Sequence, residues 1–529
     1  MLRQLDFRYY HKDIKEWEVP ITKLSYLISM FSTHDDIQLK VCKEEHTPSF
    51  SIPRDYPFRT KPYQYQLDGI NYGLNHNNWL LLDEMGLGKT LQILYLSEVL
   101  KDKGELDHCL IICGVNSLKY NWLNEINKHS RYDAMILGTR YNKSGKSYIG
   151  SMKDRIDDLL KPIKEFFIIT NIETLRDNKV IEALKKQVNK IDMIAIDEAH
   201  KAKSPTSIQG KNLLKITWPK RKIALTGTIL LNSPLDAYVP LKWTENEKSN
   251  FTKFKQLYCE YGGFRGVQIV GYKNLDLLHE QIKINSLRRK KSEVLELPPK
   301  TYKLEYVEMN DTQARFYNDI KQGVIDELDK VKLNPAYAMS LSFRLRQATA
   351  YTGILSSTIM ESAKLDRLED LVEEIIAEGN KVVVFSSFKP TLREVERRLN
   401  KKNIHNVICD GDVKDSIINE RKDQFNQDPN CKVLLGTWQK MGTGFTLTGA
   451  NYLIFIDTPF TDGLFQQAAD RIYRIGATKN VTIITLITKD TVDERVQDII
   501  EGKAALSDFV VDGIINNEHA YDFINFLLQ

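Results

Sequence analysis

The stretch WLLLDEMGLGKTLQIL, Trp79–Leu94, joins an apolar run to two glycines, a lysine and a threonine. An apolar strand that turns through glycines into a helix presents backbone N–H groups and a favourable helix dipole to a phosphate. In this pattern Gly86 and Gly88 allow close approach, Lys89 reaches the β- and γ-phosphates, and Thr90 binds Mg²⁺. The stretch predicts an ATP site; the simpler alternative is a glycine-rich turn without a ligand.

Composition narrows the class of protein around this site. The chain has 529 residues, 42% hydrophobic and 27% charged, with a net charge of +4, so we expect several globular domains and no dominant basic surface. The six cysteines form no CxxC pair, which disfavours zinc, and Cys109 and Cys113 flank LII as in a strand core. Without a signal-like or membrane-spanning apolar run, we expect an intracellular protein, cytoplasmic or nuclear, with no membrane partner.

Short apolar runs alternate with helical segments in two parts of the chain. Buried parallel strands appear in sequence as continuous apolar runs, so the pattern predicts an α/β fold with two parallel sheets. Between the two parts, residues 231–350 lack such runs and are expected to be helical. The expected strands are NWLLLD, HCLIIC, FFIIT, DMIAID and KIALTG in the first part, and KVVVFS, VICD, KVLLGT, NYLIFID and VTIITLI in the second.

An acidic strand end supplies the second half of an ATPase site. In IDMIAIDEAH, Asp197 is placed to hold Mg²⁺ and Glu198 to orient and deprotonate the attacking water. His200, just beyond, is placed to couple this site to the second lobe. An acidic strand end is common by itself, but it is uncommon in the same lobe as a phosphate loop.

The tetrad DEAH is also the point at which a family resemblance appears. The chain resembles superfamily-two helicases and, within them, SWI/SNF-type ATPases; DEMGLGKT matches that branch, including the aspartate at position 83. Gln66-x-x-Gly69 resembles the adenine-reading glutamine motif, and SLKYNWLNEI a DNA-contacting segment. LTGTILLN resembles the coupling motif, although Ile229 replaces the usual proline. RRKKSEVLELPPK, Arg288–Lys300, resembles the segment that joins the two lobes.

The second lobe is expected to carry residues that sense the γ-phosphate. In GLFQQAADRIYRIG, Gln467, Asp470, Arg471 and Arg474 have helical spacing and predict one polar stripe on a helix. Such a stripe is normally a wet surface, but the two arginines resemble the family's arginine fingers. Just before it, the small residues of VLLGTWQKMGTGFTLTGAN offer donors that suit a phosphate backbone.

The resemblance implies two RecA-like lobes, helical insertions and a specific set of site residues. It implies ATP and Mg²⁺ as ligands and DNA as the partner, contacted mainly through its backbone. The ATP-binding set is Gln66, Asp83, Glu84, Met85, Gly86, Leu87, Gly88, Lys89 and Thr90. The coupling set is His200, Thr226, Thr228, Gly444, Gln467 and Asp470, and the DNA-binding set is Ser117, Asn121, Trp122, Thr437, Thr446 and Thr448.

The N-terminal stretch suggests a separate module. FRYY and KEWEVP predict two short strands, followed by a helix with one apolar face over residues 21–31. YHKDIKEW, with Tyr10 seven residues before Trp17, resembles the HARP module of annealing helicases, which would make Trp17 a DNA contact. The alternative is that the Tyr/Trp pair is only a small packing core.

These observations lead to a domain layout and a ranked set of functions. We expect a small α+β module with its linker at 1–55, a first lobe at 56–285 with an insertion after about 232, a joining segment at 286–300, a second lobe at 301–500 with a helical insertion at its start, and packing helices at 501–529. The leading function is an ATP-dependent translocase on duplex or branched DNA that supports annealing, fork remodelling, recombination or repair. A strand-separating DNA or RNA helicase and an ATP-driven displacer of DNA-bound protein are the alternatives; a single-strand-binding protein is a candidate partner.

Overall fold

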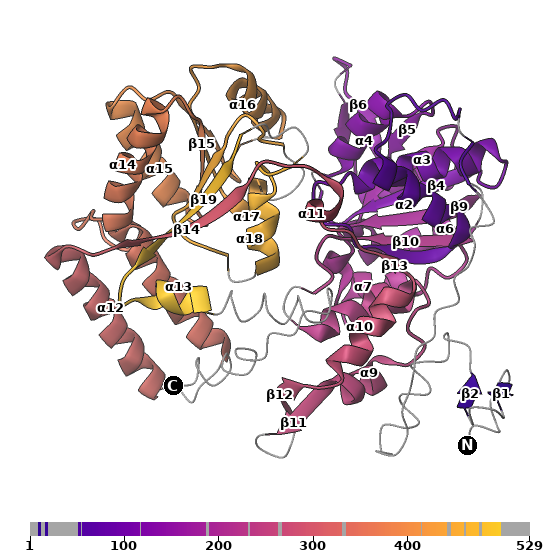
Figure 1. Ribbon diagram of the computed structural model, residues 1–529, viewed down its shortest axis with the longest axis horizontal. Coiled ribbons are helices and arrows are strands. Elements are labelled where there is room, and N and C mark those ends of the chain that lie inside the picture. Colours follow the sequence, from indigo (N-terminus) through magenta and orange to yellow (C-terminus); the bar gives the residue numbers. More distant parts are fainter. Residues whose placement is uncertain are drawn as a thin grey trace. The chain divides into compact units, whose positions relative to one another are not determined.

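The computed structural model divides into two compact units (Figure 1). Apart from Met85–Leu87, which group with the second unit, the described chain passes from the first unit to the second between Lys290 and Lys291. This crossing falls inside the segment expected to join two lobes. The structure describes residues 9–11, 16–18, 51–53, 55–116, 118–145, 147–186, 190–230, 233–262, 267–330, 335–413, 415–441, 446–459, 462–474 and 479–498.

The first unit is built on a seven-stranded, all-parallel sheet. Its strands are continuous apolar runs because helices cover both faces. The five expected strands are all present, and Cys109 and Cys113 lie fully buried in the core as expected. In spatial order the strands are β13 (Ser286–Leu287), β3 (Asn78–Leu81), β10 (Arg221–Leu225), β9 (Ile191–Asp197), β4 (His108–Cys113), β8 (Phe167–Asn171) and β5 (Ala134–Ile136).

The register of this sheet brings the predicted motifs to one edge. Leu225 pairs with both Leu81 and Asp197, and Asp197 pairs with Cys113. The chain therefore leaves β3, β10, β9 and β4 at the same carboxyl edge, where open α/β sheets bind their ligands.

Helices and short hairpins complete the first unit. The α-helices are α2 (Gln64–Asn75), α3 (Lys89–Asp102), α4 (Leu118–His129), α5 (Met152–Leu159), α6 (Asn178–Lys185), α7 (Ile208–Leu214), α8 (Tyr238–Trp243), α9 (Phe251–Tyr258) and α10 (Leu275–Ile284). Single 3₁₀ turns are η3 (Ile172–Arg176), η4 (Ala199–Ala202) and η5 (Pro234–Ala237), and the hairpins are β6 (Thr139–Tyr141) with β7 (Ser147–Ile149) and β11 (Cys259–Gly262) with β12 (Gln268–Tyr272).

The expected linker before the first lobe is in part an element of that lobe. Ile52, Tyr56 and Phe58 pack against the first core, and the Ile52 N–H donates to Asn71 at 2.9 Å. The Thr60 N–H donates to the Tyr95 hydroxyl at 2.9 Å. Three partly buried apolar side chains at even-numbered positions thus hold this otherwise exposed stretch against the first core.

The second unit is built on a six-stranded, all-parallel sheet. Val382 and Val384 belong to one core and Val383 and Phe385 to another, because successive strand residues face opposite sides. The strands are β14 (Lys300–Val307), β19 (Val481–Thr488), β18 (Tyr452–Phe455), β15 (Val382–Phe385), β17 (Val433–Gly436) and β16 (Asn406–Cys409). Two parallel-sheet units of this kind confirm the predicted fold class.

The helices of the second unit cover both faces of its sheet (Figure 1). They are α11 (Lys291–Val294), α12 (Asp311–Lys330), α13 (Pro335–Ala350), α14 (Ala363–Ala377), α15 (Lys389–Lys401), α16 (Asp415–Gln427), α17 (Trp438–Met441) and α18 (Asp462–Ala469), with the 3₁₀ turn η7 (Thr352–Ile354). In the described part of the chain, no helix combines the length and apolarity that crossing a bilayer requires.

The expectation that residues 231–350 are only helical is wrong. This stretch also contains the β11–β12 hairpin and strands β13 and β14. The apolar-run criterion missed β14 because it is an edge strand whose sequence, KTYKLEYV, alternates with charged residues.

At the N-terminus, β1 (Tyr9–His11) pairs antiparallel with β2 (Glu16–Glu18), and Tyr10 lies opposite Trp17. The two expected strands are therefore present. The helices expected at 21–31 and 501–529 lie outside the described residues.

Candidate functional site

The phosphate loop connects β3 to α3 and depends on two glycines in left-handed conformations. Gly86 has φ 85° and Gly88 has φ 73°, values that strain a residue with a side chain. A Cβ on Gly88 would lie 2.4 Å from the Gln66 side-chain nitrogen, so the amide of Gln66 rests directly on the loop. Gln66 is itself buried and accepts from the Tyr63 N–H at 3.0 Å. The structure thus brings the predicted glutamine motif and phosphate loop together.

Lys89 begins α3, and its ammonium group is held inside the loop. Its Nζ donates to the carbonyl oxygens of Asp83 at 2.8 Å and Glu84 at 3.4 Å. Burial lowers the pKa of Lys89, while the nearby carboxylates of Glu198, Asp83 and Asp197 act in the opposite direction. A buried ammonium surrounded by acceptors is suited to receive phosphate oxygens in place of the carbonyls.

Asp83 is the residue that departs from the generic phosphate-loop pattern, and it is fully buried. Arg289 forms a forked ion pair with it, through Nε to Oδ1 at 2.9 Å and through Nη2 to Oδ2. Gln92 adds a donor at 2.9 Å. The sequence indicated Arg289 only as part of the segment that joins the two lobes. Nothing in the local residue pattern indicated that Arg289 pairs with Asp83, which lies 206 residues away.

Asp197 and Glu198 end β9 at the same edge of the sheet. Burial, and secondly the charge of Glu198, raise the pKa of Asp197 to about 6. The Glu198 N–H donates to Asp197 Oδ1 at 2.9 Å, and Glu198 has a φ of 51°. A left-handed glutamate costs roughly 1–3 kcal/mol, which the surrounding structure must offset, and such strain gathers at functional sites.

Trp122 of α4 was expected to contact DNA, but the structure places it elsewhere. Its side chain is 1% exposed, and its Nε1 donates to Asp197 Oδ2 at 2.8 Å. A side chain with so little surface offers nothing to a large external ligand, and its one polar atom is already committed to Asp197. Its neighbour Asn121 is partly exposed, and Ser117 lies outside the described residues.

His200 joins the acidic pair to the predicted coupling motif. Its Nδ1 lies 3.0 Å from Thr226 Oγ1 and 3.3 Å from Glu198 Oε2. Burial lowers the pKa of His200 to about 3, so the ring is neutral at physiological pH. Because the Thr226 hydroxyl donates to the Thr228 carbonyl at 2.9 Å, its oxygen accepts from His200, which assigns the proton to Nδ1. Three expected coupling residues are therefore in one hydrogen-bonded chain.

The residues present fit a magnesium nucleotide. Thr90, partly exposed at the start of α3, and the carboxylate of Asp197 are hard oxygen donors of the kind that Mg²⁺ prefers. The raised pKa of Asp197 reflects a desolvated carboxylate beside a second one, and a cation would relieve that repulsion. Gly88 leaves the backbone open at a point where a Cβ would lie 2.4 Å from the Gln66 side-chain nitrogen.

The arginine-bearing stretch of the second unit differs from the predicted single helix. α18 ends at Ala469, and tighter i→i−3 hydrogen bonds follow at Arg471 and Ile472. Gln467, Asp470 and Arg471 are 2%, 5% and 9% exposed, so these residues do not form the solvated surface that such a stripe normally makes. Helical periodicity could not indicate the buried partner of Asp470, which is Lys291 at 2.6 Å.

The two arginines have defined partners within the second unit. Arg471 Nε donates to the Gln467 carbonyl at 3.1 Å, and Arg474 Nη1 donates to the Thr446 hydroxyl at 2.7 Å. Thr437 is 6% exposed and Thr448 is partly exposed, whereas Gly444 lies outside the described residues. The structure therefore brings a predicted finger, Arg474, to a residue predicted to contact DNA, Thr446.

Comparison with known proteins gives two family matches that together span most of the chain. The SNF2-related domain matches residues 63–354, and the helicase conserved C-terminal domain matches residues 363–476. A solved structure, the Sulfolobus solfataricus SWI2/SNF2 ATPase core in complex with dsDNA, is 24% identical and covers 88% of this chain and 96% of its own. The TM-score of this comparison is 0.38.

Several curated proteins are similar over most of this chain. An uncharacterized ATP-dependent helicase of Mycoplasma pneumoniae is 25% identical over 93% of the chain and 47% of its own length. The DNA annealing helicase and endonuclease ZRANB3 of Bos taurus is 27% identical over 86% and 41%, and the ATP-dependent helicase FUN30 of Saccharomyces cerevisiae is 26% identical over 84% and 46%. The chain thus spans less than half the length of these relatives.

The contact between Trp122 and Asp197 leads to a test. We expect Trp122→Phe, which keeps the ring but removes the indole N–H, to lower ATP turnover about ten-fold, since a hydrogen bond to a charged group contributes about 1.5–3 kcal/mol. DNA affinity should change little. The matched control is Trp243→Phe, another buried tryptophan, whose Nε1 has no hydrogen-bond partner among the described residues. Steady-state ATPase assays measure ATP turnover of the two variants, and titrations measure their DNA affinity. If Trp122→Phe weakened DNA binding and left turnover unchanged, the DNA-contact hypothesis would be restored.

Proposed function

Because the chain belongs to the SNF2-related family, we propose that it hydrolyses ATP with Mg²⁺ and uses the energy to move along duplex or branched DNA. The observation that carries the proposal is the gathering of Lys89, Asp197 and Glu198 at the carboxyl edge of the first sheet. A phosphate-binding ammonium beside two carboxylates is the arrangement that phosphoryl transfer to water requires.

Each residue of this edge has a distinct proposed task. Lys89 exchanges its carbonyl acceptors for phosphate oxygens, and Gly86 and Gly88 let backbone N–H groups approach them. Glu198 orients the attacking water and takes its proton, and Trp122 fixes the carboxylate of Asp197. When bound by Asp197 and Thr90, Mg²⁺ neutralises charge on the phosphates.

A chain of contacts from Glu198 through His200 to Thr226 connects the nucleotide site to the coupling motif. The His200 ring is neutral and hydrogen-bonded, so any shift of Glu198 alters the distance to Thr226 without a change of charge. Thr226 in turn holds the turn at Thr228. We propose that Arg471 and Arg474 of the second unit supply positive charge to the leaving phosphate, as arginine fingers do.

DNA as the track is supported by the family and by one relative, ZRANB3, whose name describes a DNA annealing helicase. The hydroxyls of Thr446 and Thr448 and the amide of Asn121 remain proposed contacts to the DNA backbone. An annealing or fork-remodelling role is the finer proposal: ZRANB3 is named a DNA annealing helicase, and the Tyr10–Trp17 pairing is compatible with a base-stacking hairpin at the N-terminus.

The proposed division of labour separates binding from hydrolysis. We expect Lys89→Ala to weaken ATP binding at least ten-fold and to abolish turnover, because the charge that holds the phosphates is lost. Glu198→Gln should keep ATP bound and reduce turnover by 100-fold or more, since the base is removed at constant shape. The control Glu105→Gln changes a partly exposed carboxylate that pairs with Arg221. Nucleotide-binding fluorescence and ATPase assays with DNA decide; near-normal turnover in Glu198→Gln would refute the assignment of the base.

The N-terminal hairpin allows a test of the finer proposal. We expect removal of residues 1–50 to keep basal ATP hydrolysis while lowering the ratio of stimulation by forked DNA to that by plain duplex. The deletion stops at residue 50 because Ile52 packs into the first core. Trp17→Ala should reproduce part of the loss, whereas Tyr9→Ala, on the other face of the pleat, should not. An unchanged fork-to-duplex ratio in the deletion would sink the recognition role.

A further inference from the structure

The segment Arg288–Lys291, here called the strap, is the point at which the chain passes from one unit to the other. Its first half is bound to the first unit. The Leu82 N–H donates to the Leu287 carbonyl at 2.8 Å and the Glu84 N–H to the Arg289 carbonyl at 3.0 Å, so the strap extends β13 along the start of the phosphate loop. Arg288 Nη1 donates to the Leu82 carbonyl at 2.7 Å. The backbone of the loop is thus clamped from both its N–H and its C=O groups.

Arg289 reaches the ATP-binding lysine through one intermediate residue. Its guanidinium holds both carboxylate oxygens of Asp83, and Lys89 Nζ donates to the carbonyl oxygen of that same Asp83 at 2.8 Å. Room for this pair is reserved by the missing side chain at Gly69, where a Cβ would lie 1.9 Å from Gln92 Oε1 and 3.0 Å from Arg289 Nη2. The position of the Lys89 ammonium therefore depends on Arg289.

Lys291 lies two residues after Arg289 and contacts the residues next to the two arginines of the second unit, as Arg289 contacts the residue that accepts from Lys89. Its Nζ donates to Asp470 Oδ1 at 2.6 Å and to the Tyr473 carbonyl at 2.8 Å, and both ion-pair partners are almost fully buried. Asp470 and Tyr473 are the residues that immediately precede Arg471 and Arg474. One ammonium thus holds a side-chain carboxylate next to Arg471 and a backbone carbonyl next to Arg474, the two proposed arginine fingers.

Burial alone does not explain these contacts as stability devices. Removing charges from water costs several kcal/mol per ion, so a buried ion pair contributes little net stability compared with apolar packing. Here two such pairs lie two residues apart on the strap, one beside the phosphate-binding lysine and one beside the arginines. Both acidic partners, Asp83 and Asp470, flank groups assigned to ATP hydrolysis.

We infer that Arg289 and Lys291 are positioning residues for ATP hydrolysis, and that the strap transmits the state of the phosphate loop to the arginine-bearing turn. The inference rests on the proposed ATPase function and adds a covalent route to it. When phosphate replaces the carbonyl acceptors of Lys89, Asp83 is displaced, and Arg289 moves with it. Because Arg289 and Lys291 are only two residues apart, the backbone carries this movement to Lys291. Loss of the Lys291 anchor leaves Lys89 in place but uncouples it from the arginine-bearing turn, whereas loss of the Arg289 anchor also disturbs Lys89 itself.

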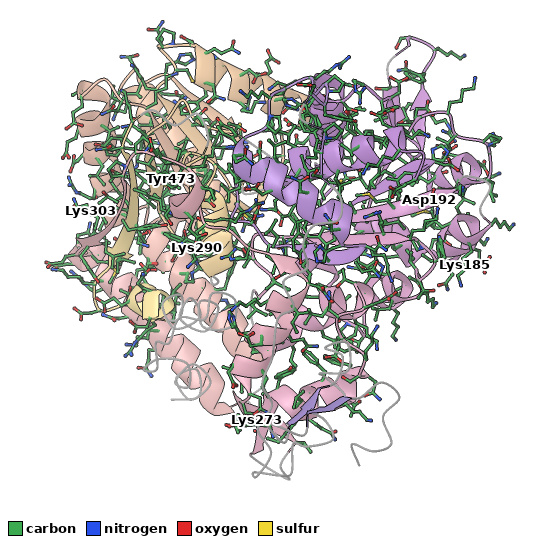
Figure 2. The ribbon with its side chains drawn as sticks, turned by 45° about the vertical axis from the view of Figure 1, so that its right-hand side comes forward. Lys185, Asp192, Lys273, Lys290, Lys303 and Tyr473 are labelled. Carbon is green, nitrogen blue, oxygen red and sulfur yellow. The ribbon has the colours of Figure 1, made fainter. Side chains whose placement is uncertain are left out.

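The test compares Lys291→Met, Lys291→Arg and Arg289→Gln with the control Lys303→Met. Lys303 carries a half-exposed ammonium that pairs with Glu305 at 2.5 Å, and it lies on the edge strand β14, at the left margin of the view in Figure 2. For Lys291→Met we expect DNA-stimulated kcat to fall about ten-fold, with the KM for ATP and the Kd for DNA changed less than about three-fold, because a 1.4 kcal/mol loss of transition-state positioning is a ten-fold effect. Lys291→Arg should recover part of kcat.

Arg289→Gln should lower kcat and also raise the KM for ATP, since it lies nearer the phosphate-binding lysine. If the strap is a single coupling route, the two losses should not add. The DNA-stimulated kcat of the double variant Arg289→Gln, Lys291→Met should then be no lower than the kcat of the less active single variant. Wild-type stimulation in Lys291→Met, or independent losses that multiply in the double variant, would overturn the inference. Absence of DNA-stimulated turnover in the wild-type chain would instead overturn the proposed function, so the two failures are distinguishable.

Discussion

The site depends on a single buried cation, the ammonium of Lys89, held at the carboxyl edge of a parallel sheet. Isolated in an apolar core it would be costly, and its pKa is lowered accordingly; three carboxylates and two carbonyls make it tolerable. Each of these acceptors is fixed by something else: Asp83 by Arg289, Asp197 by Trp122, and Glu198 by a strained turn and His200. The need to accommodate one charge thus links residues at the ends of three strands, β3, β9 and β13.

Much of this arrangement could be predicted from the sequence because it follows from local patterns. Continuous apolar runs identified the buried strands, and glycines followed by Lys89 identified the turn into α3. Parallel topology then forces Asp83, Asp197 and Thr226 to the same edge, so motif order alone implies their proximity. The edge strand β14 escaped notice because a strand that is exposed along most of its length lacks the apolar run on which this reasoning depends.

What the sequence could not reveal are partners that local spacing does not encode. Trp122 lies in a segment that resembles a DNA contact, yet its indole N–H turns inward to Asp197. The stripe from Gln467 to Arg474 has helical spacing, but Lys291, 179 residues away, binds Asp470 beyond the last helical residue, Ala469. Aspartate at position 83 marked the SWI/SNF branch without a reason; the buried fork with Arg289 now supplies one. Glycine at that position would leave the guanidinium without a carboxylate.

The central claim is that hydrolysis at this edge drives movement along duplex DNA. It is tested most directly by displacement of a labelled third strand from a DNA triplex, because a triplex strand is removed by translocation on the duplex without separation of its base-paired strands. The account predicts ATP-dependent displacement, with none when the non-hydrolysable analogue of ATP replaces ATP. DNA-stimulated ATP hydrolysis without any displacement of the third strand would contradict it.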